Sequence, residues 1–273
     1  MDCETTEIRL LLDGIYSEYG YDFRQYAFAS IRRRILSRLT AENVHTITEL
    51  LSKLLHEPGA MERFLVAVTV HTTSMFRDPG FYGVFRRKAV PMLRTYPSVR
   101  LWVAGCSTGE EVYSLAMLLD EEGLTKKCRV YATDLSDVVL KRAKGGIFPL
   151  SSMKEYTENY IRSGGTRSFS GYYRAEGDAA IFRSSLVENV VFAHHNLVTD
   201  ASFNSFNVIL CRNVMIYFDS NLQNHVHKLI YESLEPLGFL ALGQAESLRF
   251  TPYEGNYEEV DDTGKLFRRV SAS

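Results

Sequence analysis

The fold is decided by residues 99–119, which read VRLWVAGCSTGEEVYSLAMLL. The apolar run at the start is short enough for a buried strand, and it leads to two glycines four positions apart. Apolar residues then recur at helical spacing, at Val112, Leu115, Ala116 and Leu119. This pattern predicts a strand, a tight turn and a helix, an arrangement that brings backbone amides close to a ligand. We therefore expect a nucleotide-type pocket at this turn.

The glycine spacing narrows the choice of ligand. The pattern is Gly-x-x-x-Gly followed by Glu110 and Glu111, whereas a dinucleotide fingerprint needs Gly-x-Gly-x-x-Gly and a phosphate-binding loop needs Lys followed by Ser or Thr. Two carboxylates at the start of a helix repel a pyrophosphate and suit a cationic ligand that is rich in hydroxyl groups. S-adenosylmethionine, a sulfonium without phosphate, fits this description. The alternative is that the acids only complement the helix dipole.

Composition predicts a globular protein of the cytoplasm. The chain has 273 residues, of which 45% are hydrophobic and 23% are charged, and its net charge is −2. No apolar run is as long as a membrane span, and the N-terminus lacks the features of a secretion signal. The four cysteines form no Cys-x-x-Cys pair. We therefore expect reduced thiols, no metal, no nucleic-acid partner and no membrane insertion.

Residues 1–70 are predicted to form a helical domain, because apolar residues share helical faces at 8–15, 28–39 and 47–55. The second face contains Phe28, Ile31, Ile35 and Leu39. The same segment carries four arginines, Arg32, Arg33, Arg34 and Arg38. Such a charge run is usually a solvated face, and the alternative is a docking surface for an acidic partner helix.

Residues 71–95 are predicted to form a linker that also serves as a lid. Hydroxyl-bearing residues and Arg77 precede a helix-like stretch at 81–93. A segment that crosses between two domains can supply side chains such as Thr73 and Arg77 to a pocket. The alternative is a plain linker whose Thr and Ser residues cap helices.

Residues 96–273 are predicted to form an α/β domain. Strands are expected at 128–132, 189–193, 206–211, 238–243 and 266–270. Asp134 lies 25 residues beyond Gly109, close to the distance at which an acid after a second strand binds a ribose in Rossmann-like folds. A helix start at 134–137 is the competing interpretation. Ligand groups gather at the carboxyl ends of such strands, so we expect Gly105, Asp134, Asn196 and Asn213 at one edge.

A small antiparallel ribbon is predicted within this domain, as an insertion at about 158–190. Short runs at 171–175 and 179–183 are joined across Glu176, Gly177 and Asp178, and glycines and aromatic residues surround them. We therefore expect a small β-subdomain beside the main sheet.

Four segments together resemble the CheR family of chemotaxis-receptor protein-glutamate O-methyltransferases. They are AGCSTGEEVYS at 104–114, ATD at 132–134, HNL at 195–197 and CRNVMIYF at 211–218. The resemblance spans essentially the whole chain. It implies an all-α N-terminal domain, then a Rossmann-like methyltransferase sheet of the α/β class with an inserted small antiparallel β-subdomain. It also implies S-adenosylmethionine as methyl donor, S-adenosylhomocysteine as product, and the cytoplasmic helical bundle of a chemoreceptor or a related signalling protein as partner.

The resemblance further implies the roles of individual residues. Arg77 and Tyr217 would act at the reacting end. The cofactor would be contacted by His71, Thr73, Arg77, Gly105, Glu110, Glu111, Asp134, Asn196, Leu197, Arg212 and Asn213. The receptor would be met by Arg32, Arg33, Arg34 and Arg38, which replaces the interpretation of a solvated face. The short turn at 176–178 predicts a member that needs no receptor tether, and we expect a monomer.

The chemistry requires little from the protein. A glutamate carboxylate with an unperturbed pKa of about 4.3 is ionised at neutral pH, so its attack on a sulfonium methyl group needs no general base. The guanidinium of Arg77 can hold such a carboxylate with two hydrogen bonds. Two alternatives are considered: a nicotinamide dehydrogenase, which the glycine spacing disfavours, and a non-catalytic module that binds S-adenosylmethionine or S-adenosylhomocysteine in signalling.

Overall fold

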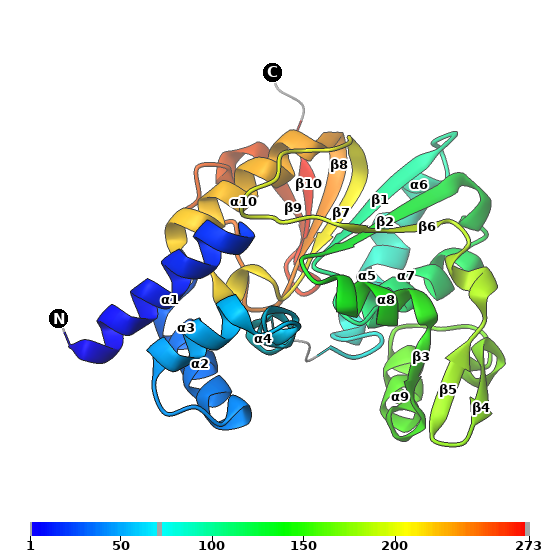
Figure 1. The fold of residues 1–273 in the computed structure, drawn as a ribbon. Coiled ribbons are helices and arrows are strands. Elements are labelled where there is room, and N and C mark those ends of the chain that lie inside the picture. The colour runs from blue at the N-terminus through cyan, green and yellow to red at the C-terminus, as the bar shows by residue number, and fades with distance from the viewer. Residues whose placement is uncertain (1, 70–72, 271–273) are drawn as a thin grey trace. The chain divides into compact units, whose positions relative to one another are not determined.

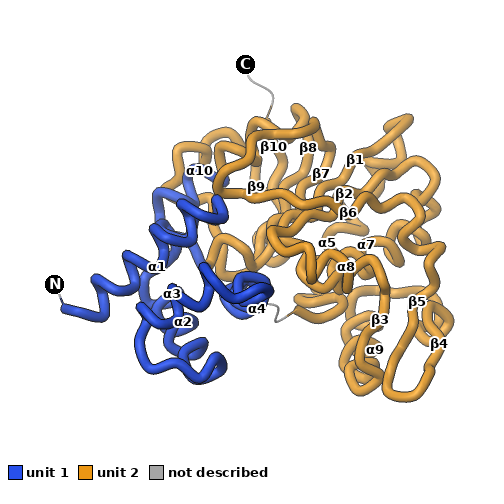
Figure 2. Tube along the Cα trace, viewed as in Figure 1, with its two compact units in different colours: residues 1–71, 217–226 blue, residues 72–216, 227–273 orange. Residues whose placement is uncertain are grey.

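The computed structural model describes residues 2–69 and 73–270. The chain divides into two compact units (Figure 2): residues 1–71 with 217–226 form a helical unit, and residues 72–216 with 227–273 form an α/β unit. Helix α10 (Ser220–Ser233) is shared, because its first residues cluster with the helical unit and its last residues with the α/β unit. The return of 217–226 to the helical unit was not predicted from the sequence.

Periodic apolar faces explain the helices of the helical unit. These are α1 (Cys3–Tyr19), α2 (Phe28–Glu42), α3 (Ile47–His56) and α4 (Ala60–Val68). Thr46 and Glu49 form a capping box at the start of α3. The apolar face of α1 is buried as its spacing predicts, through Ile8, Leu11, Leu12 and Ile15. Phe28, by contrast, is 48% exposed, because the apolar face of α2 is buried only from Ile31 onward.

The structure corrects the prediction that Arg34 binds a partner. Arg34 is buried, and its Nη1 donates a hydrogen bond to the carbonyl of Val68. It lies three residues after Ile31 and directly before Ile35, both of which are buried, so it shares their face of α2. Arg34 therefore points into the helical unit.

The other three arginines of α2 differ among themselves. Arg32 pairs with Glu4 of α1, and Arg38 pairs with Glu42 in the last turn of α2. Arg33 is exposed. The predicted basic surface is thus reduced to Arg33 and to side chains that already have acidic partners.

The α/β unit contains a seven-stranded sheet with the order β6-β2-β1-β7-β8-β10-β9 (Figure 1). The strands are β1 (Val99–Ala104), β2 (Cys128–Asp134), β6 (Val190–His194), β7 (Phe206–Cys211), β8 (Leu234–Leu242), β9 (Tyr257–Asp261) and β10 (Leu266–Arg269). The first five strands in the order are parallel, and β10 is antiparallel to both of its neighbours. The predicted Rossmann-like α/β class is confirmed. Strand β9 was missed, because its sequence, YEEVD, is mostly polar.

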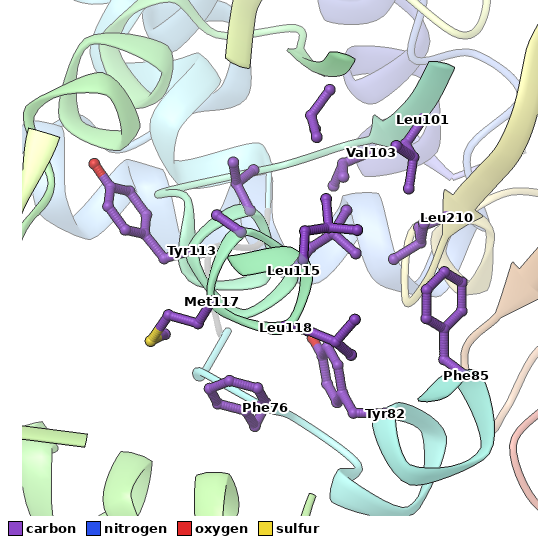
Figure 3. Packing of buried hydrophobic residues seen from close by; sticks show 14 of the residues in the cluster. Phe76, Tyr82, Phe85, Leu101, Val103, Tyr113, Leu115, Met117, Leu118 and Leu210 are labelled. Atoms are coloured by element: carbon purple, nitrogen blue, oxygen red, sulfur yellow. The ribbon is translucent and has the colours of Figure 1, made fainter. Parts of the chain in front are cut away.

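Helix α7 is the centre of the apolar core of this unit. The helices here are α5 (Pro79–Lys88), α6 (Val90–Leu93), α7 (Glu110–Glu121), α8 (Asp137–Gly145) and α9 (Met153–Arg162). Figure 3 shows Leu115 and Leu118 of α7 among buried side chains from the strands and from the start of the unit, including Leu101, Val103, Leu210, Phe76, Tyr82 and Phe85. Because α7 is buried on most of its circumference, its first turn is held rigidly against the sheet. No helix in residues 2–69 or 73–270 has both the length and the apolar character needed to cross a membrane.

The smaller sheet has the order β3-β5-β4 and is antiparallel. It consists of β3 (Ile147–Pro149), β4 (Tyr173–Glu176) and β5 (Ala179–Phe182). The predicted hairpin across Gly177 is therefore present. The subdomain begins earlier than the predicted 158, because β3 adds a third strand that is too short to be recognised by alternation. The independence from a receptor tether, which was inferred from the short turn, stays a prediction.

We predict that Glu42 makes the stability of the helical unit depend on pH. Its carboxylate lies 3.0 Å from Arg63 Nη2 and 3.1 Å from Lys53 Nζ, and it also pairs with Arg38. The hydrogen bonds from Arg63, followed by those from Lys53 and Arg38, lower the pKa of Glu42 to about 2. A lowered pKa in the folded state means that this stabilisation is complete above the ordinary pKa of about 4.3 and is lost as the pH falls toward 2.

The substitution Glu42→Gln should therefore lower the free energy of unfolding by about 1–3 kcal/mol at pH 7. The difference from wild type should shrink as the pH falls from 5 toward 2, as measured by urea denaturation. Glu18→Gln, an exposed position in α1, serves as the control. A loss for Glu42→Gln that is the same at every pH would contradict the prediction.

Candidate functional site

The carboxyl ends of four neighbouring strands meet at one edge of the main sheet. Ala104 at the end of β1 lies opposite Thr133 of β2, and Asp134 lies opposite His194 of β6. Strand β7 pairs with β1 on the other side. The residues that the sequence predicts at one edge lie at these ends: Gly105 directly follows β1, Asp134 ends β2, and Asn196 and Asn213 lie two residues beyond β6 and β7.

The turn after β1 alternates between ordinary and left-handed backbone. The φ angles are +72° at Gly105, +50° at Ser107 and +101° at Gly109. A Cβ atom on Gly105 would lie 2.6 Å from a methyl group of Val214, and one on Gly109 would lie 2.9 Å from the Cβ of Ala143. Both glycines are thus required by backbone conformation and by close packing.

Asp134 fixes the conformation of this turn. Its Oδ2 accepts a hydrogen bond from the amide of Ser107 at 2.9 Å, and its Oδ1 accepts one from the amide of Ser136 at 3.1 Å. Ser136 is the N-cap of α8, so the predicted helix start is present as well. The buried carboxylate of Asp134 therefore joins the ends of two strands to the start of a helix.

The two acids that follow Gly109 lie in different surroundings. Glu110 is buried and accepts a hydrogen bond from the hydroxyl of Thr108 at 2.6 Å. Burial raises the pKa of the Glu110 carboxyl, against the opposite effect of that hydrogen bond. Glu111 instead forms an ion pair with Arg212, with 2.6 Å between Oε1 and Nη1. The negative charge of Glu111 is thus balanced within the protein.

Arg212 lies at the centre of a buried charge cluster. Its Nη1 donates to Glu111, and its Nη2 donates to Asp78 Oδ2 at 2.9 Å and to the carbonyl of Arg77 at 3.2 Å. The guanidinium also lies 4.3 Å from the ring centre of Phe81. Because both terminal nitrogens of Arg212 bind the protein, this residue positions α7 and the segment before α5. A direct cofactor contact by Arg212 stays a prediction.

The charge cluster also places Arg77 next to the site edge. Phe76 and Asp78 on either side of Arg77 have left-handed φ angles of 52° and 54°, and the amide of Phe76 donates to the hydroxyl of Ser114 in α7 at 2.8 Å. The side chains of Thr73 and Arg77 are half-buried. This segment is therefore tied to the α/β unit, and its role as a lid stays a prediction.

Glu246 is a site residue that the sequence analysis missed. Its buried carboxylate accepts hydrogen bonds from four backbone amides, those of Gly243 at 2.6 Å, Asn213 at 2.9 Å, and Val214 and Met215 at 2.8 Å. Burial raises the pKa of Glu246, although the four amides favour its charged form. Glu246 thereby fixes the segment after β7, where Asn213 has a φ of +61°.

Asn196 and Leu197 lie in a tight turn after β6, and both are buried. The amide of Asn196 donates to Asp200 Oδ2 at 2.8 Å, and its side-chain oxygen accepts from the amide of Val198 at 3.0 Å. The turn thus holds both residues beside the carboxyl end of β2.

Tyr217 and His71 are the remaining predicted site residues. Tyr217 belongs to the helical unit, where the guanidinium of Arg34 lies 4.4 Å from the centre of its ring. His71 lies outside the described residues. In the described part of the chain, no group of three or more His, Cys, Asp or Glu residues is arranged to hold a metal ion.

Comparison with known proteins identifies the class to which this fold and site belong. Residues 71–261 match the S-adenosylmethionine-binding domain of CheR methyltransferases, and residues 6–69 match the all-alpha domain of the same proteins. The chain is 47% identical over 263 residues to the Cher3 protein of Pseudomonas putida, covering 96% of each chain. It is 29% identical over 238 residues to a chemotaxis protein methyltransferase of Listeria monocytogenes, covering 85% of this chain and 86% of that protein.

A chemotaxis protein methyltransferase of Salmonella typhimurium is 30% identical over 243 residues, which cover 85% of this chain and 81% of that protein. The protein is therefore an S-adenosylmethionine-dependent methyltransferase. More narrowly, the chain belongs to the CheR methyltransferase family.

The donor set at the sheet edge fits S-adenosylmethionine. The carboxylates of Glu110, Glu111 and Asp134 surround the turn after β1. S-adenosylmethionine presents a sulfonium, an ammonium group and ribose hydroxyls, and it has no phosphate for these carboxylates to repel. The cofactor that the sequence predicts is confirmed by the match to the S-adenosylmethionine-binding domain, and the dehydrogenase alternative is excluded.

We predict that Glu246→Gln destabilises the site. An amide in this place has one oxygen and one N–H₂ group, so roughly two of the four backbone amides lose their acceptor. The free energy of unfolding should fall by about 2–4 kcal/mol, as measured by urea denaturation. Calorimetry should also show weaker binding of S-adenosylhomocysteine. Glu258→Gln, at an exposed position of β9, should change neither quantity, and unchanged stability of Glu246→Gln would rule out the anchoring role.

Proposed function

We propose that this protein transfers the methyl group of S-adenosylmethionine to glutamate side chains of a chemoreceptor or a related signalling protein, which yields glutamate methyl esters. Relatives named chemotaxis protein methyltransferases support the receptor as substrate. The methylated region of such a receptor is a helical bundle in the cytoplasm, so we propose that the enzyme acts there, as a monomer.

The observation that carries this proposal is the placement of Arg77. The Arg77 carbonyl is bound by Arg212, which also pairs with Glu111 at the start of α7. The backbone of Arg77 is thus held next to the acidic edge that suits the methyl donor. A guanidinium in this place can bind an incoming carboxylate with two parallel hydrogen bonds. We therefore propose that the group that accepts the methyl is a carboxylate and not an amine.

The bound cofactor supplies an electrophilic methyl group on a sulfonium. The protein's own residues then have two tasks, which are to align the carboxylate and to exclude water. No residue needs to remove a proton, because the substrate carboxylate is ionised at neutral pH. We propose that Arg77 aligns the carboxylate and that the phenol of Tyr217 orients the reacting groups.

We propose that the cofactor is held by residues from the four strand ends and from the segment before α5. They are Thr73, Gly105, Glu110, Glu111, Asp134, Asn196, Leu197 and Asn213. In this arrangement Arg212 acts indirectly, since it fixes Glu111 and the backbone of Arg77. The receptor would meet α2 at its exposed Arg33, with Arg32 and Arg38 contributing after their acidic partners are displaced.

The function is tested with purified receptor cytoplasmic fragments and S-adenosylmethionine labelled in its methyl group. We expect label in the receptor that base releases as methanol, because methyl esters hydrolyse in base and methylated amines do not. Replacement of the methylated glutamates by glutamine should abolish the labelling. Binding of S-adenosylhomocysteine without any transfer would instead favour a non-catalytic signalling module.

We predict that Arg77→Ala lowers kcat by roughly 100-fold, because one preorganised donor to the reacting carboxylate is lost. Its affinity for S-adenosylhomocysteine should stay within about 2-fold, since the strand-end residues that hold the cofactor are untouched. Labelling reactions stopped at fixed times measure kcat, and calorimetry measures the affinity for S-adenosylhomocysteine. Arg87→Ala, an exposed arginine on α5, is the matched control. Full activity of Arg77→Ala would remove Arg77 from the mechanism.

A further inference from the structure

The segment that follows β7 is held by a different unit at each of its two ends. The amides of Asn213, Val214 and Met215 bind Glu246 in the α/β unit. From Tyr217 onward the chain belongs to the helical unit. The short helix η5 (Met215–Tyr217) therefore carries the connection between the two units.

The helical unit binds residues 217–219 through backbone and ring contacts. The carbonyl of Tyr217 accepts a hydrogen bond from the amide of Ala27 at 2.9 Å, and the amide of Asp219 donates to the carbonyl of Gln25 at 2.9 Å. Phe218 forms a β-bridge with Tyr26, and their ring centroids are 5.0 Å apart. The stretch directly before α2 thus fixes the backbone of Tyr217.

Arg34 fixes the side chain of Tyr217. Its guanidinium lies 4.4 Å from the centre of the Tyr217 ring, and its Nη1 donates to the carbonyl of Val68 at the end of α4. Arg34 is buried, and a cation held over an aromatic ring attracts it more strongly when water is absent. Because the Arg34 guanidinium binds the Val68 carbonyl and also lies over the Tyr217 ring, the ring has little freedom to rotate.

Tyr217 follows the anchored segment after β7 by only a few residues. Tyr217 is two residues after Met215, whose amide is bound to Glu246. Two consecutive Cα–Cα steps of about 3.8 Å each limit the separation of these Cα atoms to about 7.6 Å. The backbone of Tyr217 is therefore tied by covalent bonds to the segment that follows β7.

We propose that Arg34 is a positioning residue for Tyr217, and that its loss lowers the rate of methyl transfer. The inference rests on the proposed function, in which Tyr217 acts at the reacting end. Arg34 is not a catalytic residue here, because it acts through the ring of Tyr217. Arg34 is buried, so it is not available to a partner. The same burial makes it suitable for holding the Tyr217 ring in place.

The test compares Arg34→Met with Arg34→Lys in the full chain, using receptor fragments and labelled S-adenosylmethionine. A ring misplaced by about 1 Å can cost on the order of 100-fold in rate, so we expect kcat of Arg34→Met to fall by roughly 10- to 100-fold. The KM for S-adenosylmethionine should stay within about 2-fold. Arg34→Lys keeps a cation at the ring and should recover part of kcat.

Arg9→Met provides the contrast, because Arg9 is exposed on α1 of the same unit and lies outside the proposed receptor surface. It should leave kcat unchanged. Circular dichroism and binding of S-adenosylhomocysteine check that each variant folds. If Arg34→Met does not fold, Arg34→Lys takes its place in every comparison that follows.

A double-mutant cycle with Tyr217→Leu decides whether Arg34 acts through Tyr217. We expect the Arg34 substitution to have no further effect on kcat once Tyr217 is leucine. Losses that multiply, a normal kcat for the Arg34 variant, or a normal kcat for Tyr217→Leu would each overturn the inference. A wild-type enzyme that labels no receptor glutamate would overturn the proposed function instead, so the two failures are distinguishable.

Discussion

The site depends on the buried ion cluster in which Arg212 binds Glu111 and Asp78. These three residues come from the end of β7, the first turn of α7 and the position before α5, so a single guanidinium sets the mutual placement of three elements. A buried ion pair contributes little net stability, yet loss of one partner leaves a charge unpaired and costs about 3–5 kcal/mol. The main effect of the cluster is therefore to fix the positions of these three elements. It also fixes the backbone of Arg77.

Local patterns were enough to predict the class of fold. The strand, turn and helix at 99–119 follow from periodicity and from two glycines, and the structure shows these elements at 99–104 and 110–121. Parallel strands then bring their carboxyl ends together, so the gathering of Gly105, Asp134 and Asn213 at one edge also follows. These inferences succeed because each uses only neighbouring residues and one rule of sheet topology.

The contacts between distant residues could not be predicted in this way. Glu246 lies 33 positions beyond Asn213, whose amide it binds. The only local signal for its role is that an acidic residue follows a strand that ends near the site edge. The receptor-binding role that the family resemblance implies for Arg34 is wrong, because the four arginines of α2 do not share one exposed face. The spacing of Arg34 from Ile31 and Ile35 places it on the buried face of α2, and this helical geometry outweighs the composition of the segment.

The anchoring of residues 213–215 by Glu246 also has a consequence for how the enzyme is made. During synthesis the strands that carry the site edge, β1, β2, β6 and β7, are all complete when Cys211 has been added. The amides of residues 213–215 nevertheless lack their hydrogen-bond acceptor until residue 246 is synthesised, because Glu246 follows β8 in the chain. A nascent chain that stops short of this point contains the five parallel strands but lacks the acceptor for the amides of residues 213–215. The conformation of residues 213–215 is therefore completed by a residue that is synthesised after β8.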